Sequence, residues 1–282
     1  MSRVAVLTDS AASLPSELAA AHGVTVVPLQ VIVDGVGYRE GVDITSAEVV
    51  ARLEEGSVVT TSQPSPEEFA AAIQAAADAG AAEAVIVTLS KDLSGTFSAA
   101  GTAAAAAPIP VEVVDSRTVA MGQGFAVLAA AQAAADGAPA AAVRDAAERT
   151  ARGSTCVFTV DTLDYMRRGG RISPAIAAVG RVLGIRPVLH MVDGAVAMRG
   201  PVRSSARARA ALADAARDAL ADLALRGLTG GVAVLSAGPA SVPHAPESAA
   251  MTVEGDVSAA LAAHTGPGTV AVCVAPWGVL GD

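Results

Sequence analysis

The first half of the sequence alternates short, continuously apolar runs with alanine-rich runs of helical length. Consecutive hydrophobic residues, rather than alternating ones, predict strands buried on both faces of a sheet. Such strands are predicted at Val4–Thr8, Val24–Val33, Ala84–Thr88 and Val111–Asp115. Helices are predicted between them, at Pro15–Ala21, Ser46–Gly56, Pro66–Ala79, Ser94–Ala107 and Gly122–Asp136. Strand, helix and strand in succession predict βαβ units and a parallel sheet.

The pattern changes after about residue 152. Asp193-Gly194 lies between two apolar runs, which is typical of a β-hairpin and therefore of antiparallel pairing. Three prolines between Pro239 and Pro246 oppose a helix in that segment. The other strands and helices of this half are predicted at Cys156–Val160, Thr162–Arg168, Ser173–Leu183, Arg203–Leu225, Gly231–Ser236 and Thr269–Val274.

These patterns predict an α/β fold with two domains, residues 1–152 and 153–282. We expect a parallel sheet flanked by helices in the first domain, and a mixed or antiparallel sheet in the second. The two domains should pack tightly, with a cleft between them. In open α/β sheets ligands bind at the carboxyl ends of the strands.

Charge and composition narrow the class of protein. The net charge of −9 and the aromatic content of 2% argue against a general nucleic-acid binder. The two long uncharged stretches, 93–111 and 118–135, are mostly alanine and gain too little from lipid to predict a transmembrane segment, although transient membrane contact is left open. Asp9 comes too early for a secretory signal, so we expect a cytoplasmic protein in which Cys156 and Cys273 are buried thiols.

Basic residues are concentrated in one part of the chain. The segment from Arg144 to Arg226 contains 14 arginines, no lysine and 8 acidic residues, a net charge of +6, whereas the remainder carries −15. This asymmetry has two interpretations. It is either a docking surface for an anionic partner or a general preference for arginine over lysine.

Two hydroxyl-rich turns precede predicted helices. Around the first, Ser65, Pro66 and Glu68 form a helix start with a capping box, which leaves Thr61 and Ser62 without a structural explanation. Hydroxyls beside free backbone N–H groups can hold an anion, although an ordinary loop is also rich in serine and threonine.

In the second turn, Ser94 is a natural N-cap and Gly95 allows a ligand to approach the backbone closely. This turn lacks the Gly-x-Ser-x-Gly pattern of a nucleophile elbow, and no Gly-Lys-Ser/Thr of a phosphate-binding loop follows it.

Two glycine-rich motifs carry a basic side chain. Gly169-Gly170-Arg171 is a tight turn that either presents Arg171 to an anion or forms a solvated basic loop. His264 stands before a rigid Gly-Pro-Gly turn, so its position is defined, and it is either a ligand-binding or a structural histidine. The sequence contains none of the spaced cysteine, histidine or carboxylate motifs of zinc and calcium sites, so we expect no metal.

Taken together, these segments resemble the DegV family, the fatty-acid-binding subunits of bacterial fatty acid kinase. The resemblance covers nearly the whole chain and keeps the order of the motifs. It is carried by Thr8-Asp9-Ser10, Leu14-Pro15, Thr61-Ser62-Gln63-Pro64-Ser65, Leu93-Ser94-Gly95-Thr96, Val114-Asp115-Ser116-Arg117, Gly122-Gln123-Gly124, Gly169-Gly170-Arg171-Ile172-Ser173, Arg203 and His264-Thr265-Gly266-Pro267-Gly268. The chain departs from the family at Pro239–Pro246, where other members have a helix.

The resemblance implies a function and a site. It implies a protein without turnover or cofactor of its own, which encloses one long-chain fatty acid in an apolar tunnel and presents it to a separate kinase that forms the acyl phosphate. The residues implied to bind the carboxylate are Thr61, Ser62, Ser94, Gly95 and His264. Arg171 and Arg203 are implied to act at the head group or in docking the kinase partner.

Two other functions stay open at this point. The first is a serine hydrolase or acyltransferase using Ser94 and His264, although the elbow glycines and an obvious third group are missing. The second is a binder of sugar or nucleotide phosphates, which would need phosphate-binding glycines and a basic pocket in place of a tunnel.

Overall fold

The computed structural model describes residues 3–179, 186–240 and 242–279, and three sheets organise them. The first is a four-stranded sheet in the order β2-β1-β6-β7, in which every pairing is parallel. Its strands are β1 (Val4–Asp9), β2 (Val24–Val27), β6 (Glu83–Thr88) and β7 (Val111–Asp115). The predicted parallel sheet in the first half of the chain is therefore confirmed.

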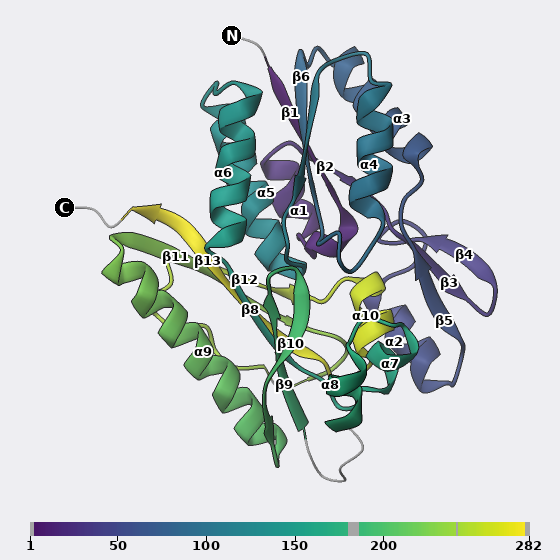
Figure 1. The fold of residues 1–282 in the computed structure, drawn as a ribbon, viewed down its shortest axis with the longest axis vertical. Helices are drawn as coiled ribbons and strands as arrows, with labels where there is room; N and C mark the ends of the chain where they lie inside the picture. Colours follow the sequence, from purple (N-terminus) through teal and green to yellow (C-terminus); the bar gives the residue numbers. More distant parts are fainter. Residues whose placement is uncertain (1–2, 180–185, 241, 280–282) are drawn as a thin grey trace.

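Helices cover both faces of this sheet (Figure 1). On one face, Leu7 and Ile86 pack against α3 and α4; on the other, Val6 and Val87 pack against α5 and α6. Burial on both faces is the reason why the central strands β1 and β6 are almost continuously apolar. The helices of this half around the sheet are η1 (Ser10–Ala12), α1 (Ser16–Ala21), α3 (Pro66–Asp78), α4 (Thr96–Ala105), α5 (Ala120–Ala135) and α6 (Ala140–Arg152).

The apolar run Val24–Val33 does not form the single strand that its composition predicts. It is interrupted at Pro28, which has no N–H to donate to a ladder, and the chain leaves the parallel sheet there. It continues as the central strand of a small antiparallel sheet with the order β4-β3-β5. The elements of this part are β3 (Gln30–Val33), β4 (Val36–Arg39), α2 (Ser46–Glu54) and β5 (Val59–Ser62).

The second half is built on a six-stranded mixed sheet with the order β10-β9-β8-β13-β11-β12. The pair β11–β12 is parallel and the other pairs are antiparallel, including the predicted hairpin β9–β10 at Asp193-Gly194. The strands are β8 (Thr155–Thr159), β9 (Arg186–Val192), β10 (Ala195–Val202), β11 (Leu228–Ser236), β12 (Met251–Asp256) and β13 (Val270–Val279).

The two faces of this mixed sheet have different partners. Helix α9 (Ser205–Leu225) covers one face with buried alanine and leucine side chains. The other face packs against α5 of the first half, where Phe125 is fully buried and meets the ring of Trp277 edge to face at 6.0 Å between centroids. The halves of the chain are therefore joined by a continuous apolar core, which fixes their relative position.

The short helices of the second half that the structure describes are α7 (Asp164–Arg168), α8 (Pro174–Val179) and α10 (Ala259–Thr265). The last four residues of the predicted helix 173–183 lie outside the described residues. The described part of the segment 239–246 contains no helix, as its prolines predict. Among the helices that the structure describes, none is long and apolar enough to cross a membrane.

Candidate functional site

A cavity of about 170 Å³ lies between the two halves of the chain. The first half lines it from β5, from the turn between β6 and α4, and from the chain around β3 and α5. The second half contributes β8, α7, the hairpin β9–β10 and α10. The lining residues are Leu29, Thr61, Ser62, Gln63, Leu89, Leu93, Ser94, Val119, Phe158, Met166, Arg171, Met191, Val196, Ala260, Leu261, His264 and Thr265.

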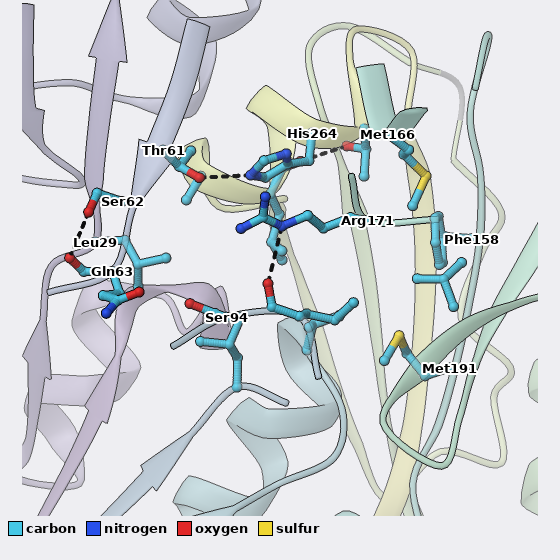
Figure 2. Close-up of a pocket in the computed structure, with 17 residues that line it drawn as sticks. Leu29, Thr61, Ser62, Gln63, Ser94, Phe158, Met166, Arg171, Met191 and His264 are labelled. Atoms are coloured by element: carbon cyan, nitrogen blue, oxygen red, sulfur yellow. Dashed lines mark hydrogen bonds between the residues drawn. The ribbon is translucent and has the colours of Figure 1, made fainter. Parts of the chain in front are cut away.

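Most polar side chains of this cavity lie apart from its methionine and phenylalanine side chains, while Leu29 lies beside Ser62 and Gln63 (Figure 2). Thr61, His264 and Arg171 gather on one side, whereas Phe158, Met166 and Met191 lie on the other. The residues Ser62 and Gln63 are exposed, while the apolar wall is largely buried. The cavity is therefore amphiphilic, with its polar end at the protein surface.

His264, on α10, makes a hydrogen bond at the polar end. Its Nε2 lies 2.7 Å from the hydroxyl oxygen of Thr61 on β5, which joins the two halves of the chain. Burial of the ring, with a smaller contribution from Arg171, lowers the pKa of His264 to about 4. The imidazole is consequently neutral at pH 7, and it can donate or accept one hydrogen bond at each nitrogen according to its tautomer.

Arg171 supplies the positive charge of the site. Its Nε donates to the carbonyl oxygen of Leu93 at 3.1 Å, and its Nη1 donates to the carbonyl oxygen of Gly169. These bonds hold the half-buried guanidinium beside the cavity. Within the described part of the chain, no carboxylate lies within ion-pairing distance of Arg171. Its charge is therefore available to an anionic ligand.

Ser94 lines the cavity from the turn before α4, and this helix begins later than predicted. The helix starts at Thr96 with Gly95 as its N-cap, so the prediction of Ser94 as the cap is wrong. The Ser94 hydroxyl lies 2.9 Å from that of Thr96. Gly95 does not line the cavity itself; it packs against Gln63, and a Cβ at Gly95 would lie 2.5 Å from Oε1 of Gln63.

The predicted glycine motifs position the basic side chains. A Cβ at Gly169 would lie 2.2 Å from Nδ1 of His264, so only glycine allows the imidazole its place. Gly266 has φ of +79° and lies against the ring of Tyr165, where a Cβ would come within 2.3 Å. The Gly-Gly-Arg and Gly-Pro-Gly segments, far apart in the sequence, therefore bring His264 and Arg171 to one place.

The predicted site residues separate into three groups. The cavity is lined by Thr61, Ser62, Ser94, Arg171 and His264. Gly95 does not line it but packs against Gln63, which does. By contrast, Arg203 is exposed just before α9 and does not line the cavity.

Sequence reasoning missed the apolar wall. Met166, Met191 and Val196 come from a short helix and a hairpin, and their apolar character alone does not distinguish them from core residues. The Asp193-Gly194 signal predicts the hairpin, but it does not indicate that the hairpin lies over the cavity.

The tip of the hairpin β9–β10 is bonded to the first half of the chain. Ser90 Oγ donates to the carbonyl oxygen of Gly194 at 2.6 Å, and Arg117 Nη2 donates to that of Asp193 at 2.6 Å. Just inside the tip, Met191 and Val196 pair across the hairpin and both line the cavity. The hairpin thus covers the cavity, and two hydrogen bonds fasten it.

The fold and this cavity define an α/β protein with an amphiphilic site enclosed between a parallel and a mixed sheet. Over residues 3–276 the chain matches the model of the DegV family, a family described as uncharacterised proteins. It is 40% identical over 279 residues to a DegV domain-containing protein of Streptomyces coelicolor, covering 97% of this chain and 99% of that protein. The chain belongs to the DegV family.

Solved structures of the family have the same fold. A DegV family protein from Thermus thermophilus, described as fatty acid binding, is 32% identical and superposes with a TM-score of 0.86 over 98% of this chain and all (100%) of that one. DegV from Bacillus subtilis, described as a fatty acid binding protein, is 26% identical with a TM-score of 0.83 over 98% of this chain and 100% of its own.

Proposed function

We propose that this protein binds one long-chain fatty acid in the cavity between its halves and presents the carboxylate to a fatty acid kinase, without turnover of its own. The observation that carries the proposal is the separation of groups around the cavity. The guanidinium of Arg171, free of any carboxylate partner among the described residues, stands with neutral His264 and two hydroxyls at one end of an apolar wall. Related proteins described as fatty acid binding support the same ligand class.

The energetics suit a carrier. Burying methylene groups gains ~0.8 kcal/mol each, so most of a sixteen-carbon tail contributes ~10 kcal/mol before the costs of binding. The hydroxyls of Thr61 and Ser94, together with Arg171, provide donors for the carboxylate. The exposed side chains of Ser62 and Gln63 place this end at the surface, where a kinase can reach it.

A long tail needs more room than the cavity offers. The volume of the cavity, about 170 Å³, is below the ~300–1,000 Å³ typical of sites for drug-sized ligands. Met166 and Met191 are flexible enough to rearrange, and Met191 lies on the fastened hairpin. We therefore infer that the hairpin moves when the tail enters or leaves.

Weakening the attachment of the hairpin tip should speed ligand exchange. In Ser90→Ala, and more so in Ser90→Ala with Arg117→Ala, we expect palmitate to dissociate several-fold faster, because each hydrogen bond contributes ~1 kcal/mol to holding the hairpin closed. Stopped-flow displacement of a fluorescent fatty acid measures this rate. Arg52→Ala, which removes an exposed arginine remote from the hairpin tip, serves as the control. Dissociation as slow as in the parent protein would rule out hairpin movement as the gate.

Removing the Ser94 hydroxyl should weaken binding and leave the fold intact. In Ser94→Ala the carboxylate loses one donor, for which we expect a ~10-fold lower affinity for palmitate by isothermal titration calorimetry. Ser98→Ala, on the exposed side of helix α4, which begins two residues after Ser94, is the matched control. An unchanged affinity in Ser94→Ala would contradict the proposed head-group site.

Arg203 is proposed to dock the kinase partner, since it is exposed and outside the cavity. We expect Arg203→Ala to bind palmitate normally but to lose acyl phosphate formation when mixed with a fatty acid kinase catalytic subunit. The control is Arg217→Ala, an exposed arginine further along α9 that is paired with Asp214. Acyl phosphate formation at the rate of the parent protein would refute this role of Arg203.

A serine hydrolase is less well supported. The hydrogen bond of His264 Nε2 is to Thr61, and the Ser94 hydroxyl bonds to Thr96, so the two groups do not form a nucleophile–base pair. Labelling of Ser94 by a reactive-serine probe would support the hydrolase function instead.

A further inference from the structure

Glu40 is a buried carboxylate that the proposed binding site does not use. It follows β4 in the first half of the chain and is only 5% exposed. No arginine, lysine or histidine among the described residues lies within ion-pairing distance of it. Burial raises its pKa. An isolated buried carboxylate is costly, so the groups that bond to it have to offset that cost.

The partners of Glu40 lie at the start of α10, in the second half of the chain. Its Oε1 accepts the backbone N–H of Ala260 at 2.8 Å, and its Oε2 accepts the hydroxyl of Ser10. The N–H of Ala259 and the hydroxyl of Ser258 also favour the ionised form of Glu40. The first N–H groups of a helix have no partner within the helix, so a carboxylate at this end satisfies them and is itself stabilised.

Other side-chain oxygens also accept backbone N–H groups at this end of α10. Ser13 in the first half accepts the N–H of Ser258 at 3.0 Å, and the hydroxyl of Ser258 accepts the N–H of Leu261 at 3.3 Å. The first half of the chain thus anchors the start of the helix through Ser13 and Glu40. Ser10, bonded to Glu40, also accepts the N–H of Leu29, which lines the cavity.

Helix α10 carries much of the polar end of the cavity. Ala260 and His264 lie one turn apart on it, and both line the cavity together with Leu261 and Thr265. The bond from Ala260 to Glu40 and the bond from His264 to Thr61 are therefore made by opposite ends of one short helix. A shift at its first turn moves the imidazole at its last turn.

We propose that Glu40 is a positioning residue, whose carboxylate anchors the first turn of α10 to the first half of the chain and so holds the imidazole of His264 against Thr61. For its consequence on ligand affinity, this inference rests on the proposed fatty-acid site. The placement of His264 itself is tested without ligand, so the failure of one proposal is distinguishable from the failure of the other.

The test measures the titration of His264 by NMR of the histidine rings, of which the protein has four. In the parent protein we expect the ring of His264 to stay neutral above pH 5, given its pKa of about 4. In Glu40→Ala we expect its pKa to move towards the ordinary value of 6.5, since a displaced ring is more exposed to water. Palmitate affinity should fall ~10-fold, as for one lost charge-assisted hydrogen bond.

The conservative variant separates positioning from charge. Glu40→Gln keeps an oxygen that can accept the N–H of Ala260. We therefore expect this variant to retain both the low pKa of His264 and most of the affinity for palmitate. Glu67→Ala removes an exposed carboxylate from the first turn of α3, a helix with no residue in the cavity lining, and should leave both unchanged. If His264 in Glu40→Ala titrates as in the parent protein, the inference is wrong.

A second variant covers the case in which Glu40→Ala fails to fold. Ser10→Ala removes the hydroxyl that donates to Oε2 and leaves the carboxylate in place. We expect it to raise the pKa of His264 in the same direction but by less. An unchanged titration in Ser10→Ala would then overturn the inference. Should the pKa of His264 respond while no variant, nor the parent protein, binds palmitate, the positioning role stands and the proposed function fails.

Discussion

Gly169→Ala is expected to lower the affinity for palmitate by about 10–100-fold, as for the loss of one or two hydrogen bonds to a charged group. The added methyl group would lie 2.2 Å from Nδ1 and 2.9 Å from Cε1 of His264, and the imidazole has to leave its place beside Thr61. Because Nδ1 sits on a ring already bonded at Nε2, the ring cannot relieve this contact by a small rotation. Calorimetric titration with palmitate measures the loss.

The neighbouring glycine provides a matched control. Gly170 has φ of +69° and open space around its Cβ position, so Gly170→Ala introduces backbone strain of ~1–2 kcal/mol without touching His264. We expect Gly170→Ala to be less stable but to bind palmitate almost normally. If Gly169→Ala also binds normally, His264 has no part in holding the ligand.

Phe125→Ala is expected to lower the free energy of unfolding by about 3–5 kcal/mol, the usual cost of emptying a large buried site. Phe125 is fully buried in the core that joins the two halves, between Trp277 and Gly231. A Cβ at Gly231 would lie 2.6 Å from Cε1 of Phe125, so the ring already fills this space closely. Equilibrium unfolding in urea, followed by far-UV circular dichroism, gives the change.

Phe97→Ala makes the same substitution at a half-buried site. Phe97 lies on α4 beneath the ammonium of Lys91, whose Nζ is 5.9 Å from the ring centroid. Its loss should cost markedly less than that of Phe125. Equal effects at the two positions would contradict the close packing of Phe125 in the core between the halves.

The fold was predictable where the pattern of hydrophobic residues was local and strong. The buried central strands β1 and β6 of the parallel sheet and the capping box at Ser65 were visible in the sequence, because burial on both faces and a helix start each leave a distinct pattern. The division of Val24–Val33 between two sheets was not visible in the sequence, since one proline, Pro28, is the sign of the break between the strands. Helix α6 and strand β12 were also missed, the latter because its mixed, half-exposed residues lack a clear alternation.

The site was predictable only as a set of motifs. Thr61, Ser94, Arg171 and His264 were singled out from their turns, yet their convergence depends on how the two halves pack, which no local pattern encodes. The apolar wall could not be predicted, because its leucines and methionines look like ordinary core residues in a sequence. The bonds of Ser90 and Arg117 to the hairpin tip could not be predicted either, because they go to backbone carbonyls far along the chain. Glu40 likewise became interpretable only once α10 was placed beside it.

Native mass spectrometry of the purified protein, followed by denaturation and identification of what is released, tests the central claim most directly. We predict one long-chain fatty acid per chain, and a smaller bound fraction in Gly169→Ala than in Gly170→Ala. A protein that carries no fatty acid and takes up neither added palmitate nor added oleate would contradict the proposed function.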